Sequence, residues 1–234
     1  MTALRVALLG AGRLGREIAT LAPDRQATIV ATFGRTAPVS VGALRDAGAQ
    51  VVIDVSVADA VMTNAEACLA AELPLVIGVT GWQGAEAALR ADVESAGASV
   101  LVAPNFSVGA TLFSAAVADA ARRFAAALGF DAHIVETHHA LKRDAPSGTA
   151  HRLAELAEAA RGTAVPVTSV RVGQVPGVHT LLLDAAFEQV RLTHEARDRR
   201  VFADGALLAA RWLTGRRGWF TMEDVVRDMT GSTR

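Results

Sequence analysis

The first half of the chain alternates short, continuously apolar runs with stretches that are apolar on one helical face only. In the first such stretch Leu14, Ile18 and Leu21 share a face, and Pro23 ends the pattern. The apolar runs are short and bounded by Gly, Pro or polar residues, which is typical of buried strands. The pattern predicts strands at residues 5–9, 28–33, 50–55, 75–78 and 98–103, and further helices at 57–71 and 83–96.

Strands that are apolar along their whole length must be covered on both faces. Helices that alternate with such strands supply that cover in a parallel sheet. The first half therefore predicts the α/β class, with a Rossmann-type doubly wound parallel sheet of the kind that binds nucleotides.

The pattern changes after residue 107. A long helix (about 109–127) precedes a strand at 132–136, and a loop then leads to another helix. Three strand-like runs near 165–172, 179–187 and 189–195 follow without a helical pattern between them, which favours a second α+β lobe with a mixed sheet. The chain ends in helical patterns at 203–214 and 222–229, which we interpret as packing back on the first lobe. We therefore expect a dinucleotide-binding domain at 1–106 plus 204–234, and a substrate-binding and oligomerisation domain at 107–203.

Composition narrows the class of protein. With 51% hydrophobic and 20% charged residues among 234, the chain can bury a sizeable core. The net charge of −1 gives no field that would attract nucleic acid or an anionic membrane. Cys68 is the only cysteine, which excludes an internal disulfide and suits a reducing compartment. Neither a signal peptide nor a membrane-spanning run is recognisable, so we expect a cytoplasmic protein.

A glycine-rich turn follows the first predicted strand. Gly10, Gly12 and Gly15 satisfy a strand that turns sharply, approaches a pyrophosphate with its backbone and packs a helix closely. The N-terminus of that helix would then face the phosphates, and Arg13 could add a contact. A glycine-rich turn without a ligand is the alternative, but the position between strand and helix favours a dinucleotide.

The end of the second predicted strand bears on the choice of dinucleotide. Sites selective for NAD usually place Asp or Glu there, whereas this chain has Arg35 and Thr36. A guanidinium suits a 2′-phosphate, so the sequence favours NADPH and leaves NADH possible. A solvated loop arginine is the alternative reading.

The second chemical feature is the segment that begins at Glu136. His138 and His139 are neighbours in a predicted extended segment, so their side chains should point to opposite sides, which argues against a metal held by both. Either histidine can exchange protons near neutral pH, and Lys142 supplies a cation. Two structural histidines at a strand end are the alternative.

An anion cradle is predicted just after these residues. Ser147 is a natural N-cap for the following helix, and Gly148 allows a ligand to approach the N–H groups of Gly148 and Thr149. Asp144 is expected to fix the loop rather than to act as a base.

The segment Glu136–Ala150, with its His-His-x-x-Lys-x-Asp-Ala-Pro-Ser-Gly-Thr string, resembles the signature of the dihydrodipicolinate reductase family. That family reduces 4-hydroxy-tetrahydrodipicolinate or dihydrodipicolinate in diaminopimelate and lysine biosynthesis. The resemblance covers nearly the whole chain. It includes the segments 10–15, 54–56, 78–81, 103–109 and 202–206.

The resemblance implies a role for each matching residue. His138 would exchange the proton and Lys142 would be the second donor, while His139, Ser147, Gly148 and Thr149 would bind a dicarboxylate substrate. It also implies a homotetramer and a cofactor-binding set at the first lobe, to which the residue pattern after the second strand adds Arg35. The set from the resemblance is Gly10, Ala11, Gly12, Arg13, Leu14, Gly15, Gly78, Val79, Thr80, Ala103, Pro104, Asn105 and Phe106. Two departures affect this set: the glycine loop is one residue tighter than in many members, and Val79 replaces a usual threonine.

Two other functions stay open at this point. Another two-lobe dehydrogenase of aspartate or homoserine type would share the glycine turn, but gives no reason for the His-His-Lys string. A non-catalytic sensor would bind dinucleotide without turnover. For the reductase, we hypothesise that His138 donates its proton as an imidazolium and that Lys142 stabilises the dianionic substrate. Loop and sheet packing accounts for four further residues nearly as well as support of the substrate lobe does: Arg171, Gly173, Gly177 and His179.

Overall fold

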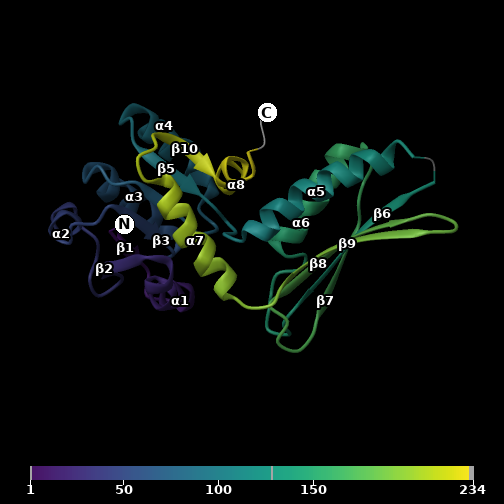
Figure 1. The fold of residues 1–234 in the computed structure, drawn as a ribbon, viewed down its shortest axis with the longest axis horizontal. Helices are drawn as coiled ribbons and strands as arrows, with labels where there is room; N and C mark the ends of the chain where they lie inside the picture. The colour runs from purple at the N-terminus through teal and green to yellow at the C-terminus, as the bar shows by residue number, and fades with distance from the viewer. Residues whose placement is uncertain (1, 128, 232–234) are drawn as a thin grey trace. The chain divides into compact units, whose positions relative to one another are not determined.

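Two units, each with its own sheet, make up the protein, whose computed structural model describes residues 2–127 and 129–231 (Figure 1). Unit 1 contains the chain up to Val108 and again from Arg200, and unit 2 contains Gly109–Arg199. Unit 1 is therefore discontinuous in sequence, because the final helices return to it.

Unit 1 contains a sheet of six parallel strands in the order β10-β5-β4-β3-β1-β2. Alternate residues of β1 face opposite sides: Val6 and Leu8 join one core cluster, and Ala7 and Leu9 the other. All four are buried, as a parallel sheet covered on both faces requires. The strands are β1 (Leu4–Leu9), β2 (Ala27–Phe33), β3 (Val51–Asp54), β4 (Leu75–Ile77), β5 (Ser99–Val102) and β10 (Gly218–Thr221).

Helices cover both faces of this sheet, as the doubly wound class predicts. One face packs against α1 (Arg13–Leu21), α7 (Arg200–Leu213) and α8 (Met222–Thr230). The other packs against α2 (Val41–Asp46), α3 (Val61–Ala70) and α4 (Glu86–Ser95), where Cys68 lies fully buried. Short 3-10 turns, η1 (Pro23–Arg25), η2 (Ala58–Ala60) and η3 (Gln83–Ala85), precede β2, α3 and α4.

Two elements of unit 1 were not expected from the sequence. The strand β10 is only four residues long and all four are partly exposed, so it carries no apolar run to reveal it. The helix α2, which Ser40 caps through a 3.2 Å bond from the Ala43 N–H, lies in a region for which the sequence predicted no element. Six residues are too few to establish a helical period.

Unit 2 contains a four-stranded mixed sheet in the order β7-β6-β8-β9. The strand β6 pairs in parallel with β7 and antiparallel with β8. Apolar residues from one face of this sheet, such as Ile134 and Leu181, form a core with residues of the two helices. The elements are β6 (Asp131–His138), β7 (Val167–Arg171), β8 (Gly177–Asp184), β9 (Gln189–Ala196), α5 (Val108–Ala125) and α6 (Gly148–Arg161).

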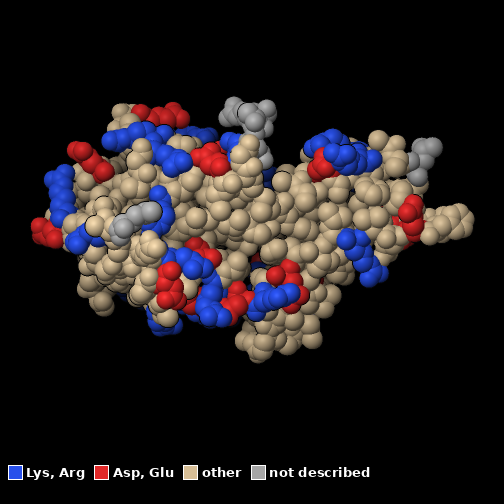
Figure 2. Space-filling view, viewed as in Figure 1, with Lys and Arg blue, Asp and Glu red and all other residues tan. Residues whose placement is uncertain are grey.

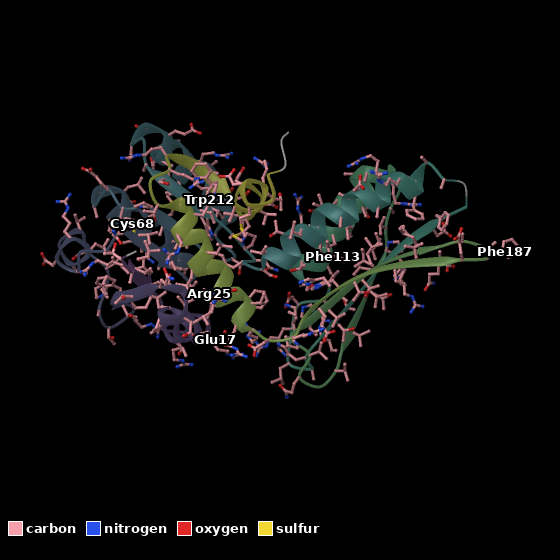
Figure 3. The ribbon with its side chains drawn as sticks, viewed as in Figure 1. Glu17, Arg25, Cys68, Phe113, Phe187 and Trp212 are labelled. Carbon is pink, nitrogen blue, oxygen red and sulfur yellow. The ribbon has the colours of Figure 1, made fainter. Side chains whose placement is uncertain are left out.

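Among the described residues of unit 2, no helix packs on the other face of the mixed sheet. Val135, Val178 and Leu182 project to this open face and stay partly exposed, between polar neighbours such as Thr180. Phe187, at the tip of the β8–β9 hairpin, is fully exposed, and Figure 3 shows its ring beyond the end of the ribbon.

Charged side chains of both signs are interspersed on the surface of each unit in the view of Figure 2, with no broad field of one sign. Among the described residues, no helix combines the length and the apolar character that crossing a membrane requires.

Candidate active site

The first group of predicted site residues lies at the carboxyl edge of the unit 1 sheet. The strand order reverses between β1 and β3, since β2 lies on one side of β1 and all later strands lie on the other. In doubly wound sheets ligands bind outside the carboxyl ends of the strands at this reversal. The glycine turn follows β1, and the segments at 34–36, 78–80 and 103–106 follow β2, β4 and β5.

The three glycines of the turn meet different steric demands. Gly10 has a φ of 103°, and a Cβ there would lie 2.7 Å from the carbonyl oxygen of Val55 after β3. A Cβ on Gly15 would lie 2.0 Å from the Gly10 oxygen, so this glycine lets α1 pack against the strand. A Cβ on Gly12 would meet no protein atom within 4 Å.

This geometry fits a dinucleotide. Gly12 is the N-cap of α1, and no side chain caps the helix. The backbone at Gly12 is therefore open on the side from which a pyrophosphate would approach, and the helix N-terminus offers it N–H groups. Arg13 and Arg35 are both exposed, so their guanidinium groups can reach an anion.

The two remaining loops of this edge are fixed by contacts with protein. A Cβ on Gly78 would lie 2.3 Å from the ring of Phe106, which is buried, so the ring packs directly on the glycine backbone. The indole N–H of Trp82 donates a 2.9 Å bond to the carbonyl of Val79. A valine at position 79 is compatible with this loop because its side chain is buried.

In unit 2, strand alternation gathers a second cluster on the helix-covered face of the mixed sheet. Glu136 and His138 are two residues apart on β6 and therefore point to the same side. The register places Arg171 of β7 beside His138 and His179 of β8 beside Glu136. The N-cap of α6, Ser147, also contacts this cluster.

Glu136 is the centre of the cluster and is fully buried. Its carboxylate accepts bonds from Arg171 Nη2 at 2.7 Å, from the Ser147 N–H at 3.3 Å and from the ring of His138. Burial alone would raise the pKa of Glu136, but the hydrogen bonds from Arg171, Ser169 and His138 outweigh it and lower the pKa to about 2. The group is therefore a carboxylate at neutral pH.

His138 is held by this carboxylate through Nδ1, so its other nitrogen, Nε2, is the one left for chemistry. Nε2 lies against Gly177, where a Cβ would be 3.0 Å away. Burial lowers the pKa of His138; Glu136 opposes this, and the charges of Lys142 and Arg171 add to it. The imidazolium that we hypothesised is thus disfavoured in the free protein.

His179 packs edge-on against the ring of His138, with 5.1 Å between centroids. Its Nε2 lies 3.3 Å from the Ser147 hydroxyl. Burial, followed by the charge of His138, lowers the pKa of His179 to about 4, so this ring is neutral at physiological pH.

The start of α6 has the geometry that the predicted anion cradle requires. Ser147 caps the helix as expected, accepting a 3.2 Å bond from the Ala150 N–H. A Cβ on Gly148 would meet no protein atom within 4 Å, so the first turn of the helix is open there. Lys142 is bound at 2.9 Å by both oxygens of Asp144, which confirms that Asp144 fixes the loop.

A metal ion was not expected at the histidines. Donor atoms of Glu136, His138 and His179 do lie within 4.8 Å of one another. However, the guanidinium of Arg171 already neutralises the carboxylate of Glu136, and this guanidinium would repel a metal cation. These contacts favour a hydrogen-bonded His–carboxylate pair over a metal centre.

The sequence identified the segment that carries the site but not all of its members. His138, Lys142, Ser147 and Gly148 lie at the end of β6 and the start of α6, as expected, while His139 follows the strand and is half-buried. Glu136 was given no role, and Arg171 and His179 were left open between support of a substrate site and packing. The available signal was their period-two spacing on strands: Glu136 with His138, Ser169 with Arg171, Gly177 with His179.

Comparisons with known proteins match both parts of the chain to the same family. Residues 4–106 match the family described as dihydrodipicolinate reductase, N-terminus, and residues 109–226 match its C-terminus. The 4-hydroxy-tetrahydrodipicolinate reductase of Gluconobacter oxydans (strain 621H) is 40% identical over 253 aligned positions, which cover 97% of this chain and 98% of the relative. That of Acidiphilium cryptum (strain JF-5) is 37% identical, with 95% and 97% covered.

A solved structure shares the fold. Dipicolinate-bound dihydrodipicolinate reductase from Paenisporosarcina sp. TG-14 superposes with a TM-score of 0.82, covering 95% of this chain and 99% of the other at 22% identity. An amine dehydrogenase of Mycobacterium smegmatis gives 0.64 at 10% identity, with 94% and 95% covered, so related two-lobe folds serve other reactions.

Proposed function

We propose, since the chain belongs to the dihydrodipicolinate reductase family, that it reduces 4-hydroxy-tetrahydrodipicolinate, or dihydrodipicolinate, to tetrahydrodipicolinate. This reaction belongs to diaminopimelate and lysine biosynthesis, and the protein is an NAD(P)H-dependent oxidoreductase. One observation carries the proposal at the level of chemistry: a buried histidine, bound to a carboxylate through one nitrogen, lies on the same sheet face that receives the N-cap of α6.

The dinucleotide belongs to the carboxyl edge of the unit 1 sheet. When bound, a reduced nicotinamide supplies the hydride for the reaction. The open backbone at Gly12 would accept the pyrophosphate, and Arg35 would pair with a 2′-phosphate, which supports NADPH over NADH. The contacting set is the one given above, from the glycine turn, Arg35 and the loops at 78–80 and 103–106.

The substrate belongs to unit 2. A carboxylate would be accepted at the first turn of α6 by Gly148 and Thr149, with Ser147 holding the turn in place. His139 would contact the substrate, and Lys142 would stabilise its negative charge. Asp144 keeps the Lys142 ammonium in position through two bonds.

His138 would supply the proton that completes reduction. Burial holds the pKa of His138 below its usual value in the free protein, which favours the neutral ring before the substrate binds. A dianionic substrate close to the ring would favour the charged form and raise that pKa. Proton uptake by His138 would therefore accompany substrate binding.

The decisive experiment follows NADPH absorbance with freshly generated dihydrodipicolinate. The wild type should turn over, and His138→Gln should lower kcat by roughly 10²–10⁴-fold with an unchanged Kd for NADPH. His151→Gln, which replaces an exposed histidine on α6, is the matched control and should keep wild-type turnover.

Each alternative gives a different result in this assay. NADPH binding without turnover would support the dinucleotide-binding sensor. Turnover with an aspartate- or homoserine-type substrate alone would support the other dehydrogenase. A His138→Gln variant with wild-type kcat would refute the assignment of the proton donor.

The remaining proposals concern partners and location. The open face of the mixed sheet, with partly exposed Val135, Val178 and Leu182, supports the homotetramer that the resemblance implies. The small net charge supports a small-molecule substrate rather than nucleic acid or a membrane surface as partner. We place the protein in the cytoplasm, where its single buried thiol stays reduced.

A further inference from the structure

We propose that Glu136 and Arg171 are positioning residues for the proton donor. Glu136 fixes the His138 ring with its hydrogen on Nδ1, and Arg171 fixes Glu136, so that Nε2 alone exchanges a proton with the substrate. This inference rests on the proposed function only in naming that substrate.

The hydrogen bonds around Glu136 determine which atoms donate and which accept. Arg171 Nη2 and the Ser147 N–H both donate to Oε1 of Glu136, and neither can accept. This leaves Oε2, which bonds His138 Nδ1. A carboxylate with a pKa of about 2 accepts and does not donate at neutral pH, so Nδ1 must carry the hydrogen.

Arg171 also links Glu136 to the loop that carries Lys142. Its Nη2 donates a 2.6 Å bond to the backbone carbonyl of Asp144, whose side chain binds Lys142. The guanidinium is mostly buried, with 18% of the side chain exposed, so its charge is weakly screened. One residue therefore aligns both the carboxylate and the loop.

The proton balance follows from this arrangement. The imidazolium carries hydrogens on Nδ1 and Nε2; transfer of the Nε2 proton to the reduced substrate leaves the neutral Nδ1–H ring bound to Glu136. Proton return from water to Nε2 restores the imidazolium. Glu136 stays ionised throughout.

The groups that face the His138 ring come from every neighbouring element. Glu136 on the same strand favours the imidazolium, while Lys142 from the following loop and Arg171 from β7 disfavour it. His179 from β8 is neutral. Removing the negative or the positive charge should therefore move the titration of His138 in opposite directions.

Glu136→Gln tests the carboxylate. Because Arg171 and the Ser147 N–H require an acceptor, the amide oxygen should face them and the amide NH₂ should face Nδ1, which forces the hydrogen onto Nε2. The expected results are a loss in kcat of roughly 10²–10⁴-fold and a descending limb of the kcat pH profile at lower pH. Glu155→Gln, at an exposed site on α6, is the control and should leave both unchanged.

Arg171→Gln tests the cation. The descending limb should move to higher pH, opposite to Glu136→Gln, and Arg171→Lys should restore its position by restoring the charge. A purely structural role would lower activity in both variants without opposite shifts. Equal directions of shift, or none, would overturn the proposal.

A measurement without turnover keeps the inference separate from the proposed reaction. ¹⁵N NMR of histidine-labelled wild type, above the titration of His138, should find Nδ1 protonated and Nε2 unprotonated. The Nε2–H form in the wild type would overturn the positioning role even if the enzyme is active. A wild type that shows the expected tautomer but no reductase activity would refute only the proposed function.

Discussion

The buried ionisable side chains Glu136 and His179 of unit 2 avoid an unpaired charge in two different ways. Glu136 is fully buried, yet its negative charge meets Arg171 and three hydrogen-bond donors. His179 lacks a charged partner of its own and stays neutral instead. Both outcomes follow from the cost of an unpaired charge in a medium of low dielectric constant.

His179 should make the protein sensitive to mild acid. Its pKa is about 4 in the folded state and near the ordinary 6.5 when unfolded, so the unfolded chain takes up a proton first as pH falls through this range. Between pH 7.5 and 5, the wild type should lose on the order of 2 kcal/mol more unfolding free energy than His179→Gln. Urea unfolding at both pH values measures this.

Above about pH 7.5 the two proteins should respond to pH alike at this position, because His179 is then neutral in both the folded and the unfolded state. Working at pH 5 or above also excludes Glu136, whose contribution is lost only as pH falls from its ordinary range towards 2. Equal losses in wild type and variant would contradict the prediction.

Arg35 is the residue on which the choice of cofactor depends. Arg35→Ala should raise the Kd for NADPH by roughly 10- to 100-fold, since it removes a charge-assisted bond worth about 1.5–3 kcal/mol. The Kd for NADH, which lacks the 2′-phosphate, should not change. Isothermal titration with both cofactors tests this, with exposed Arg152→Ala as control. An equal effect on the two cofactors would speak against a 2′-phosphate contact.

At the scale of elements, whether a helix or strand could be predicted from the sequence depended on its length and on how deeply it is buried. Strands β1, β3, β4 and β5 are mostly buried apolar runs, so their burial on two faces is visible in the sequence. The strand β10 and the helix α2 are short, and their stability comes from pairing with β5 and from the Ser40 cap rather than from local pattern. The cluster around Glu136 depends on strand register, which no local pattern reports.

The sequence alone also does not reveal where two elements approach each other so closely that only glycine fits between them. A Cβ on Gly205, in the middle of α7, would lie 1.8 Å from the backbone oxygen of Phe106. The glycine is therefore required by packing, although a glycine inside a helix is intrinsically unfavourable.

Gly205→Ala should destabilise the protein by about 1–3 kcal/mol, because helix and loop must move apart. Gly42→Ala is the matched control: this glycine is also helical, its Cβ would meet nothing within 4 Å, and the change should stabilise by about 0.5–1 kcal/mol. Urea unfolding compares the two. A Gly205→Ala variant as stable as wild type would show that the contact relaxes freely.

At the scale of the whole molecule, the two faces of the unit 2 sheet differ in what covers them. Helices cover one face with a closed apolar core, while the other face presents apolar side chains to solvent. A second copy of the chain is the partner that the family resemblance implies.

Leu182→Asp should disrupt that association. A carboxylate in an apolar interface costs several kcal/mol unless it is paired. Light scattering coupled to size exclusion should give the wild type four times the chain mass of 24.3 kDa and the variant a smaller species with an unchanged circular dichroism spectrum. His151→Asp, on the exposed surface of α6, should retain the wild-type mass. A monomeric wild type would contradict the prediction.

Unit 1 is built from two separate parts of the sequence, and this affects how the protein folds during synthesis on the ribosome. The helix α7 supplies a large share of the buried side chains against one face of the first sheet, and β10 supplies its edge. Both emerge from the exit tunnel only after all of unit 2, which is contiguous. Nascent chains should therefore complete the second unit while the first still exposes an uncovered apolar face, and holdase chaperones would find their binding surface there.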